Sequence, residues 1–141
     1  MNQTGTTVRI VSASPRETEE AGFAFAGQLG PRAVVGLYGD LGSGKTCFVQ
    51  GAARALRVEG QVNSPTYALV QVYQGKRTVI HMDAYRLKTP DEMLHIGFED
   101  YLAEEAICFI EWADRIQPLM PADALAVRFK AIDATTREIT Y

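Results

Sequence analysis

The segment from Gly39 to Thr46 has the residue types and the spacing of a loop that binds phosphate. It reads Gly-Asp-Leu-Gly-Ser-Gly-Lys-Thr and matches the pattern of Gly, four residues, then Gly-Lys-Ser/Thr. Glycines allow the backbone to wrap inward, so that several N–H groups point at one anion. Lys45 can reach the β- and γ-phosphates of a nucleotide, and the Thr46 hydroxyl can hold Mg²⁺. The motif therefore predicts a site for a triphosphate tail and its metal.

The elements on either side of this loop are those that a phosphate loop requires. Ala33–Tyr38 predicts a buried strand that leads into the loop, and Phe48–Leu56 predicts the helix that follows it. The N-terminus of that helix adds its positive dipole to the loop. A Gly-rich turn can match the pattern by accident, but the order of strand, loop and helix argues against this alternative.

Two carboxylates follow predicted strands and are expected at the same edge of the sheet as the loop. Glu111 follows the unbroken apolar run Ala106–Ile110, and Asp83 ends the strand predicted over Arg77–Asp83. Open α/β sheets bind ligands beyond the carboxyl ends of their parallel strands. Glu111 can hold the Mg²⁺ shell or orient an attacking water, unless it is an ordinary polar residue that ends a strand. Asp83 can position water, hold a magnesium-bound water, or pair with Arg86 in a salt bridge that closes the turn.

Three other positions leave their role open. The loop Ser64–Tyr67 contains Thr66, whose hydroxyl can sense the γ-phosphate and metal, although Ser-Pro also marks ordinary turns. Trp112, at the end of an apolar strand, fits either a core aromatic or the wall of a site. His81 is expected on the same side of its strand as Asp83. A lone histidine beside a strand end is more often a structural hydrogen-bonding residue than a catalyst.

The alternation of predicted strands and helices along the 141 residues indicates an α/β fold. We expect a three-layer sandwich like that of P-loop NTPases, in one domain over residues 1–141, with a mainly parallel sheet at its centre. Antiparallel hairpins are expected at the margins. One pairs Thr66–Tyr73 with Arg77–Asp83, and the other joins Leu125–Phe129 to a last strand at the end of the chain. A helix that opens with a capping box is expected over Ser14–Leu29.

Composition and charge limit the classes of partner. The chain carries 14 basic and 17 acidic residues in mixed order, with a formal net charge of −3. Binding to duplex DNA or tRNA depends mainly on basic clusters, so we do not expect the chain to bind nucleic acid alone. No segment is long and apolar enough for a membrane span, and Cys47 and Cys108 are expected as buried thiols in a reducing compartment. We therefore expect a cytoplasmic protein with no membrane partner.

Four segments occur together in a distinctive order: Gly39–Thr46, Ser64–Tyr67, His81–Arg86 and Ile110–Trp112. In this order and spacing they resemble the TsaE family, and the resemblance covers nearly the whole chain. The first motif is shared by many families, whereas the four together are specific. TsaE proteins are small bacterial P-loop ATPases needed to make threonylcarbamoyladenosine in tRNA. The resemblance therefore implies an ATP-hydrolysing subunit of that system.

The resemblance implies a role for each matching residue. The residues that would wrap the phosphates of ATP are Leu41, Gly42, Ser43, Gly44, Lys45 and Thr46. Thr46 and Glu111 would serve Mg²⁺, while Asp83 and Thr66 would support hydrolysis or sense its state. Cys47 stands where a threonine is usual, but this departure removes no phosphate or metal ligand.

The resemblance also implies what lies beyond the phosphates. Thr18 and Arg137 would lie near the base of the nucleotide. The implied partners are TsaD and TsaB, which transfer the threonylcarbamoyl group to the adenosine beside the anticodon, and tRNA would be reached only through that complex. Hydrolysis would be slow in the isolated chain and would reset the complex between turnovers.

Other classes of nucleotide protein fit the sequence less well. A small-molecule P-loop kinase, the main alternative, needs an acceptor pocket and usually an Arg-rich mobile lid, and no such segment is visible in 141 residues. A GTPase would usually carry Asn-Lys-x-Asp for guanine, and that string is absent. A nucleotide-dependent interaction module whose catalysis is incidental is compatible with the TsaE resemblance.

Overall fold

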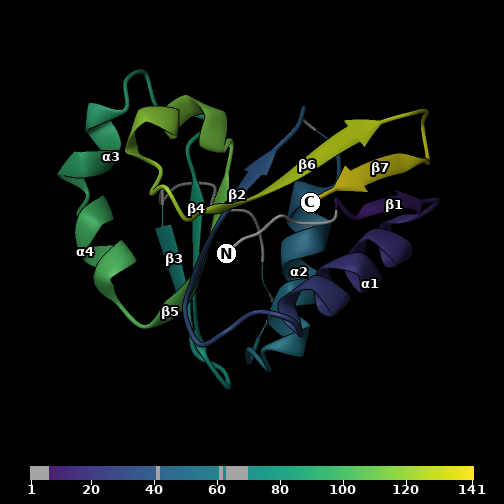
Figure 1. Cartoon of the computed structure of the whole chain (residues 1–141), viewed down its shortest axis with the longest axis horizontal. Helices are drawn as coiled ribbons and strands as arrows, with labels where there is room; N and C mark the ends of the chain where they lie inside the picture. The colour runs from purple at the N-terminus through teal and green to yellow at the C-terminus, as the bar shows by residue number, and fades with distance from the viewer. Residues whose placement is uncertain (1–6, 41, 61, 63–69) are drawn as a thin grey trace.

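The described part of the chain forms a central sheet of seven strands in the order β1-β7-β6-β2-β5-β4-β3 (Figure 1). The structure is a computed structural model, and it describes residues 7–40, 42–60, 62 and 70–141. The strands are β1 (Arg9–Ser12), β2 (Ala33–Tyr38), β3 (Val70–Tyr73), β4 (Thr78–Asp83), β5 (Ala106–Glu111), β6 (Leu125–Ala131) and β7 (Arg137–Thr140). The predicted positions Leu41 and Ser64–Tyr67, Thr66 included, lie outside the described residues.

The sheet is parallel at its centre and antiparallel at its margins, as the sequence predicts. Strand β2 pairs in parallel with β5 and β6, and β4 pairs in parallel with β5. The hairpins β3–β4 and β6–β7 are antiparallel, and β1 adds an antiparallel edge strand to β7. Because β2, β4 and β5 run in the same direction, their carboxyl ends meet at one edge of the sheet. That edge is where the phosphate loop and both predicted carboxylates belong.

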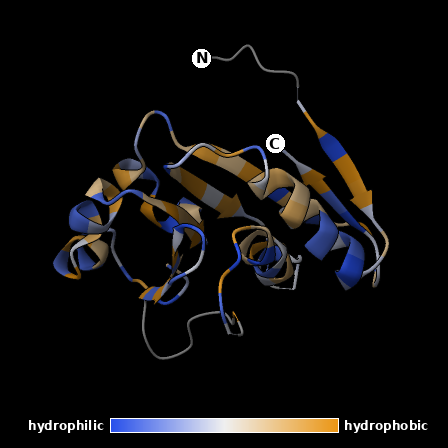
Figure 2. Cartoon of the chain, turned by 90° about the horizontal axis from the view of Figure 1, so that it is seen from below, coloured by the Kyte–Doolittle hydropathy of each residue, from blue (hydrophilic) through white to orange (hydrophobic). Residues whose placement is uncertain are grey.

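Helices cover both faces of this sheet and produce the expected three layers (Figure 1). The helices are α1 (Pro15–Ala26), α2 (Lys45–Ala55), α3 (Asp91–His95), α4 (Phe98–Ala103) and the 3₁₀ helix η1 (Ala113–Leu119). Helices α1 and α2 pack against one face, and their side chains form a core with Leu37 and Phe109. Helices α3, α4 and η1 cover the other face, with a second core around Ile80 and Cys108. Apolar residues are concentrated on the central strands (Figure 2).

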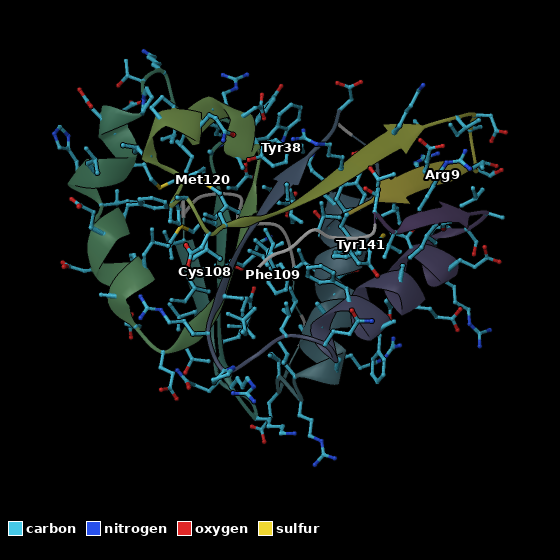
Figure 3. The ribbon with its side chains drawn as sticks, in the orientation of Figure 1. Arg9, Tyr38, Cys108, Phe109, Met120 and Tyr141 are labelled. Carbon is cyan, nitrogen blue, oxygen red and sulfur yellow. The ribbon has the colours of Figure 1, made fainter. Side chains whose placement is uncertain are left out.

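Alternation along β5 divides its side chains between these two cores. Cys108 belongs to the core under α4, and the adjacent Phe109 belongs to the core under α2, on the opposite side of the sheet (Figure 3). All six residues of β5 are buried, because helices cover both faces of this central parallel strand. Glu111, the last of them, is therefore carried into the interior by its strand.

Helix α1 begins and ends by different local rules. The Ser14 hydroxyl accepts a hydrogen bond from the Glu17 amide at 3.1 Å, which confirms the predicted capping residue. The helix ends at Ala26 rather than at the predicted Leu29. The amides of residues 28 and 29 bond to carbonyls three residues earlier, so the chain tightens into a turn after Gly27.

Candidate functional site

The loop between β2 and α2 has the conformation that its glycines permit. Gly39 and Gly44 have φ of 152° and 104°, and Gly44 is the N-cap of α2. A Cβ atom at Gly39 would lie 2.7 Å from the Phe129 carbonyl oxygen, so only glycine fits against β6 at this point. The loop thus turns tightly and presents the N-terminus of α2 to a cavity of about 340 Å³.

Most of the predicted site residues meet around this cavity. Its described lining comprises Gly42, Ser43, Gly44, Lys45, Thr46, Cys47, Asp83, Tyr85, Glu111 and Trp112. The described part of the phosphate loop and both predicted carboxylates are therefore brought together from three elements. The Ser43 hydroxyl is buried and has no hydrogen-bond partner among the described residues. A phosphate oxygen would supply an acceptor for a hydroxyl in this position.

Lys45 is held at the base of the cavity by several groups. Its Nζ donates to the carbonyl oxygens of Gly39 and Asp40, at 3.0 Å for Asp40, and lies 3.9 Å from the ring centroid of Trp112. Burial lowers the pKa of Lys45 below its usual value, while the negative charge of Glu111 and other carboxylates opposes that shift. The Asp40 side chain is exposed, so water screens its negative charge beside the predicted phosphate site.

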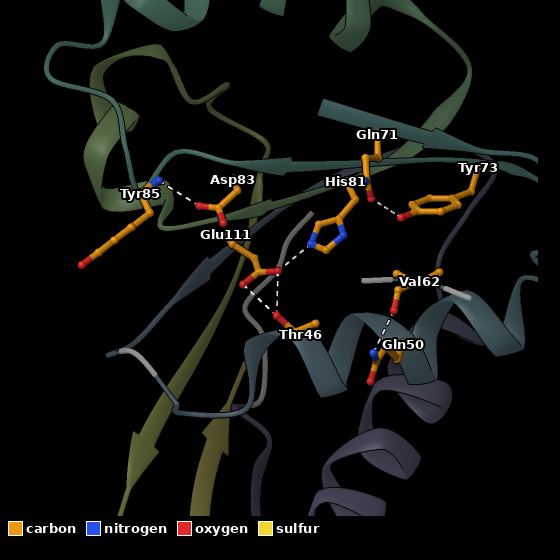
Figure 4. A network of polar contacts seen from close by, with 9 residues as sticks. All are labelled: Thr46, Gln50, Val62, Gln71, Tyr73, His81, Asp83, Tyr85 and Glu111. Carbon is orange, nitrogen blue, oxygen red and sulfur yellow. Dashed lines mark hydrogen bonds and ion pairs between the residues drawn. The ribbon is translucent and has the colours of Figure 1, made fainter. Parts of the chain in front are cut away.

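Glu111 and Asp83 lie side by side because β4 and β5 pair in register at these two residues. The Thr46 hydroxyl donates to the Glu111 carboxylate, at 3.2 Å from Oε1 and 3.1 Å from Oε2 (Figure 4). His81 Nε2 lies 2.6 Å from Glu111 Oε2. Asp83 Oδ1 accepts a hydrogen bond from the Tyr85 amide at 2.9 Å, which closes the turn after β4. The sequence indicates both carboxylates and favours a structural hydrogen-bonding role for His81, but it does not predict that His81 contacts Glu111.

Two aromatic residues form a wall of the cavity. Trp112 has a left-handed backbone, with φ of 58°, and its ring lies 4.8 Å from that of Tyr85 between centroids. The sequence left open whether Trp112 was a core residue or a site residue, and the structure places it against Lys45 in the cavity. Tyr85 lies inside the His81–Arg86 motif, and that motif is the one signal in the sequence that points to it.

A second cavity of about 360 Å³ lies on the other side of the phosphate loop. Its described lining comprises Ala13, Ser14, Pro15, Thr18, Gly42, Gly44, Cys47, Ala134, Thr135 and Arg137. It shares Gly42, Gly44 and Cys47 with the first cavity. Arg137 Nε donates to the Gly42 carbonyl oxygen at 3.2 Å, and Thr18 is fully buried beneath the loop. Thr18 and Arg137 are therefore neighbours of the phosphate loop, and their position near the base of a nucleotide, which the resemblance implies, stays a prediction.

The donor set fits a magnesium ion held jointly by protein and phosphate. Thr46 and Glu111 offer oxygen ligands, which Mg²⁺ prefers. In the part of the chain that the structure describes, no group of three or more His, Cys, Asp or Glu side chains is arranged for a metal ion. Two protein ligands, Thr46 and Glu111, suit Mg²⁺, because this ion keeps several waters and takes its remaining ligands from substrate phosphates.

A parallel α/β core, a glycine-rich loop leading from β2 into α2 and a carboxylate at the end of β5 together define a P-loop-like fold. The family model described as "Threonylcarbamoyl adenosine biosynthesis protein TsaE" matches residues 12–139. The chain belongs to the TsaE family, which is involved in tRNA threonylcarbamoyladenosine biosynthesis.

Individual relatives agree with this assignment over most of their lengths. The TsaE protein of Treponema pallidum is 35% identical over 133 residues, which are 94% of this chain and 98% of that protein. The Bacillus subtilis TsaE protein is 35% identical over 131 residues, 92% of this chain and 82% of its own length. The crystal structure of Bacillus subtilis YdiB superposes with a TM-score of 0.79 at 28% identity, covering 99% of this chain and 86% of that one.

No helix in the described ranges combines the length and the apolar character needed to cross a bilayer.

Proposed function

We propose that this chain is a magnesium-dependent ATPase subunit that supports the TsaD–TsaB pair in the threonylcarbamoylation of tRNA. One observation carries the proposal. The P-loop amides, Lys45 and the carboxylates Asp83 and Glu111 line a single cavity, so phosphate ligands and metal ligands face one another. Family membership supports the pathway, and the cavity supports the chemistry.

The residues of this chain divide the work of binding a triphosphate. Gly42, Ser43 and Gly44 would offer backbone amides to the phosphates, and the dipole of α2 would add to their attraction. Lys45 would move its Nζ from the Gly39 and Asp40 carbonyls to the terminal phosphates. A bound Mg²⁺ would neutralise charge that develops on the phosphate oxygens.

The carboxylates and the threonine would act on the metal and the water. Thr46 and Glu111 would hold the ion, since their oxygens already lie within 3.2 Å of each other. Asp83 lines the same cavity and would orient the attacking water. Thr66 is proposed to sense the γ-phosphate, as the family resemblance implies.

The second cavity would take the nucleoside end of ATP. It continues from the phosphate cavity through Gly42, Gly44 and Cys47, which line both. Arg137 and Thr18 would then lie beside the ribose or base. A ligand that spans both cavities must pass directly over the phosphate loop.

The charges in the site support the proposal that the isolated chain hydrolyses ATP slowly. Lys45 is the only cation among the described residues that line the phosphate cavity, and two carboxylates stand opposite it. Efficient phosphoryl transfer usually needs a further positive group at the transition state, often supplied by a partner protein. We therefore propose that docking to TsaD and TsaB completes the site. Contact with tRNA would be made through that complex in the cytoplasm.

The site itself is tested by a charge deletion with a matched control. Lys45→Ala should lower the affinity for ATP or its turnover by about 100-fold or more, because it removes the cation at the phosphates. Lys76→Ala removes an exposed lysine in the β3–β4 turn, at the opposite end of the sheet, and should leave both unchanged. Calorimetric titration with ATP and Mg²⁺ measures binding in both variants. Unchanged affinity and turnover in Lys45→Ala would refute the site.

The partner assignment is tested by a pull-down with the TsaD–TsaB pair, with and without ATP. Retention that depends on nucleotide, together with faster phosphate release when the pair is added, is the expected result. A small-molecule kinase would instead transfer the phosphate to an acceptor and would ignore the pair. Fast hydrolysis by the chain alone, indifferent to TsaD and TsaB, would contradict the docking role.

A further inference from the structure

His81 contacts the proposed metal ligand Glu111 but has no role in the proposed function. It lies on β4, its side chain is fully buried, and its Nε2 lies 2.6 Å from Glu111 Oε2. Glu111 itself is only 4% exposed. A buried carboxylate is costly unless other groups bond to it, and among the described residues the Glu111 carboxylate forms hydrogen bonds with His81 and Thr46.

We propose that His81 is a positioning residue that orients the Glu111 carboxylate toward the magnesium site. This inference rests on the proposed function, since it concerns the ion that Glu111 would hold. Oε2 is shared between His81 and Thr46, whereas Oε1 contacts only Thr46 among the described residues. The imidazole bonds to Oε2 only, so Oε1 keeps its capacity to bind an ion beside the Thr46 hydroxyl, which is the other proposed metal ligand.

The direction of the hydrogen bond follows from the chemistry of the partners. A carboxylate that holds Mg²⁺ is ionised and can only accept, so in that state Nε2 of His81 would carry the proton and donate it to Oε2. His81 Nδ1 is buried and has no hydrogen-bond partner among the described residues. Within the described ranges, the hydrogen bond to Glu111 is therefore the polar contact that orients the imidazole ring. Backbone pairing fixes the strand that carries the ring, because His81 lies opposite Phe109 on β5 and Gln71 on β3.

The arrangement places the histidine behind the proposed ligand and outside the cavity. Glu111 and Thr46 line the phosphate cavity, whereas His81 is not among its described lining residues. His81 would therefore act on the metal only through Glu111. Groups that hold a metal ligand in this way typically contribute 10–100-fold to metal affinity.

The test uses three substitutions that differ in where they place a donor. His81→Gln puts an amide N–H about as far from the backbone as Nε2, His81→Asn only as far as Nδ1, and His81→Leu removes the donor. Calorimetry with ADP, in the presence and absence of Mg²⁺, gives the factor by which magnesium strengthens nucleotide binding. Thermal unfolding of the same samples shows how much stability each substitution removes.

The expected result is a selective change in that magnesium factor. His81→Asn and His81→Leu should lower it by about tenfold or more, while ADP binding without Mg²⁺ stays within about twofold of the wild type. His81→Gln should keep most of the magnesium factor. A merely structural role would instead lower the unfolding temperature and weaken both kinds of binding together. If His81→Leu does not fold, the comparison of His81→Asn with His81→Gln decides the question.

The failure of this inference can be told from the failure of the proposed function. A wild-type chain that binds no nucleotide would overturn the proposed function, and the role of His81 with it. A wild-type chain with a clear magnesium factor, which the Asn and Leu variants retain, would overturn the positioning role alone. Equal loss in the Gln and Asn variants would also overturn it.

Discussion

Replacing Gly22 with alanine should destabilise the protein, although alanine is the better helix former. Helices α1 and α2 pack closely at Gly22, where a Cβ atom would overlap the Phe48 carbonyl oxygen and lie 2.8 Å from its carbonyl carbon. These are backbone atoms inside α2, so they cannot rotate away as a side chain would. Helix α1 must move outward, and the apolar contacts on that face of the sheet must loosen.

The size of the effect can be worked from these contacts. Overpacking against a rigid neighbour costs about 1–3 kcal/mol and sometimes more. The helix propensity of alanine returns roughly 1 kcal/mol, and the clash with backbone places this site at the upper end of the range. We expect a net loss of about 2 kcal/mol, which lowers the Tm of a chain of this size by roughly 4–8 °C.

Gly27→Ala is the matched control, because it makes the same chemical change at the end of the same helix. Gly27 has an ordinary helical backbone, with φ of −63° and ψ of −18°, and an added Cβ would come no closer than 3.5 Å to any atom. Alanine there should raise stability by about 0.4–1 kcal/mol, since it restricts the unfolded chain without a clash. Thermal unfolding followed by circular dichroism measures both variants. A Gly22→Ala protein as stable as the wild type, or an equal loss in both, would refute the reasoning.

Three further predictions concern the site. Ellman's reagent should react with Cys47 but not with Cys108 in the folded protein, because burial raises the pKa of Cys108 to about 12. Saturating ATP should slow the reaction of Cys47, because Cys47 lines both cavities, and reaction of both thiols at one rate would contradict the prediction. Burial lowers the pKa of Lys45 in the folded state, so at pH values just below 10.5 the unfolded chain holds a proton that the folded chain has released. The stability of the wild type should therefore rise relative to that of Lys45→Met as the pH approaches 10.5. Denaturant unfolding between roughly pH 8 and 10.5 measures this difference in stability, and a difference that does not change with pH would contradict the prediction. Arg137→Ala should weaken the binding of ATP more than that of inorganic tripolyphosphate, because Arg137 lines the cavity proposed for the nucleoside. An equal loss of affinity for the two ligands would indicate that Arg137 instead stabilises the phosphate loop through its hydrogen bond to the Gly42 carbonyl oxygen.

The phosphate loop and the carboxylates could be predicted because their signals are local. The Gly-rich spacing fixes the loop, and an apolar run that ends in a single acid fixes the strand end at Glu111. Parallel strands then bring their carboxyl ends to one edge, so Asp83 and Glu111 were expected near the loop without knowledge of the register. The observed register, in which the two residues lie directly opposite each other, confirms their proximity.

The partners of these residues could not be predicted, because they depend on contacts across the sheet. Alternation placed His81 on one side of its strand but could not show that Glu111 Oε2 would lie 2.6 Å from its ring. Trp112 was ambiguous because its left-handed backbone, which periodicity does not predict, aims its ring at Lys45. The end of α1 was placed at Leu29 because Gly30-Pro31 is the stronger stop signal, whereas the chain already turns after Gly27.

The burial of Glu111 links the fold to the proposed chemistry. Helices on both faces bury β5 completely, and this strand carries a carboxylate to the edge of the sheet at 4% exposure. In so dry a position the charge interacts strongly with its neighbours, which is why Glu111 opposes the lowering of the Lys45 pKa. The same weak screening would strengthen the attraction of both residues for a metal–phosphate pair. The central parallel strand β5 therefore does more than support the loop, because it places a buried carboxylate in the cavity where phosphate and ion would meet.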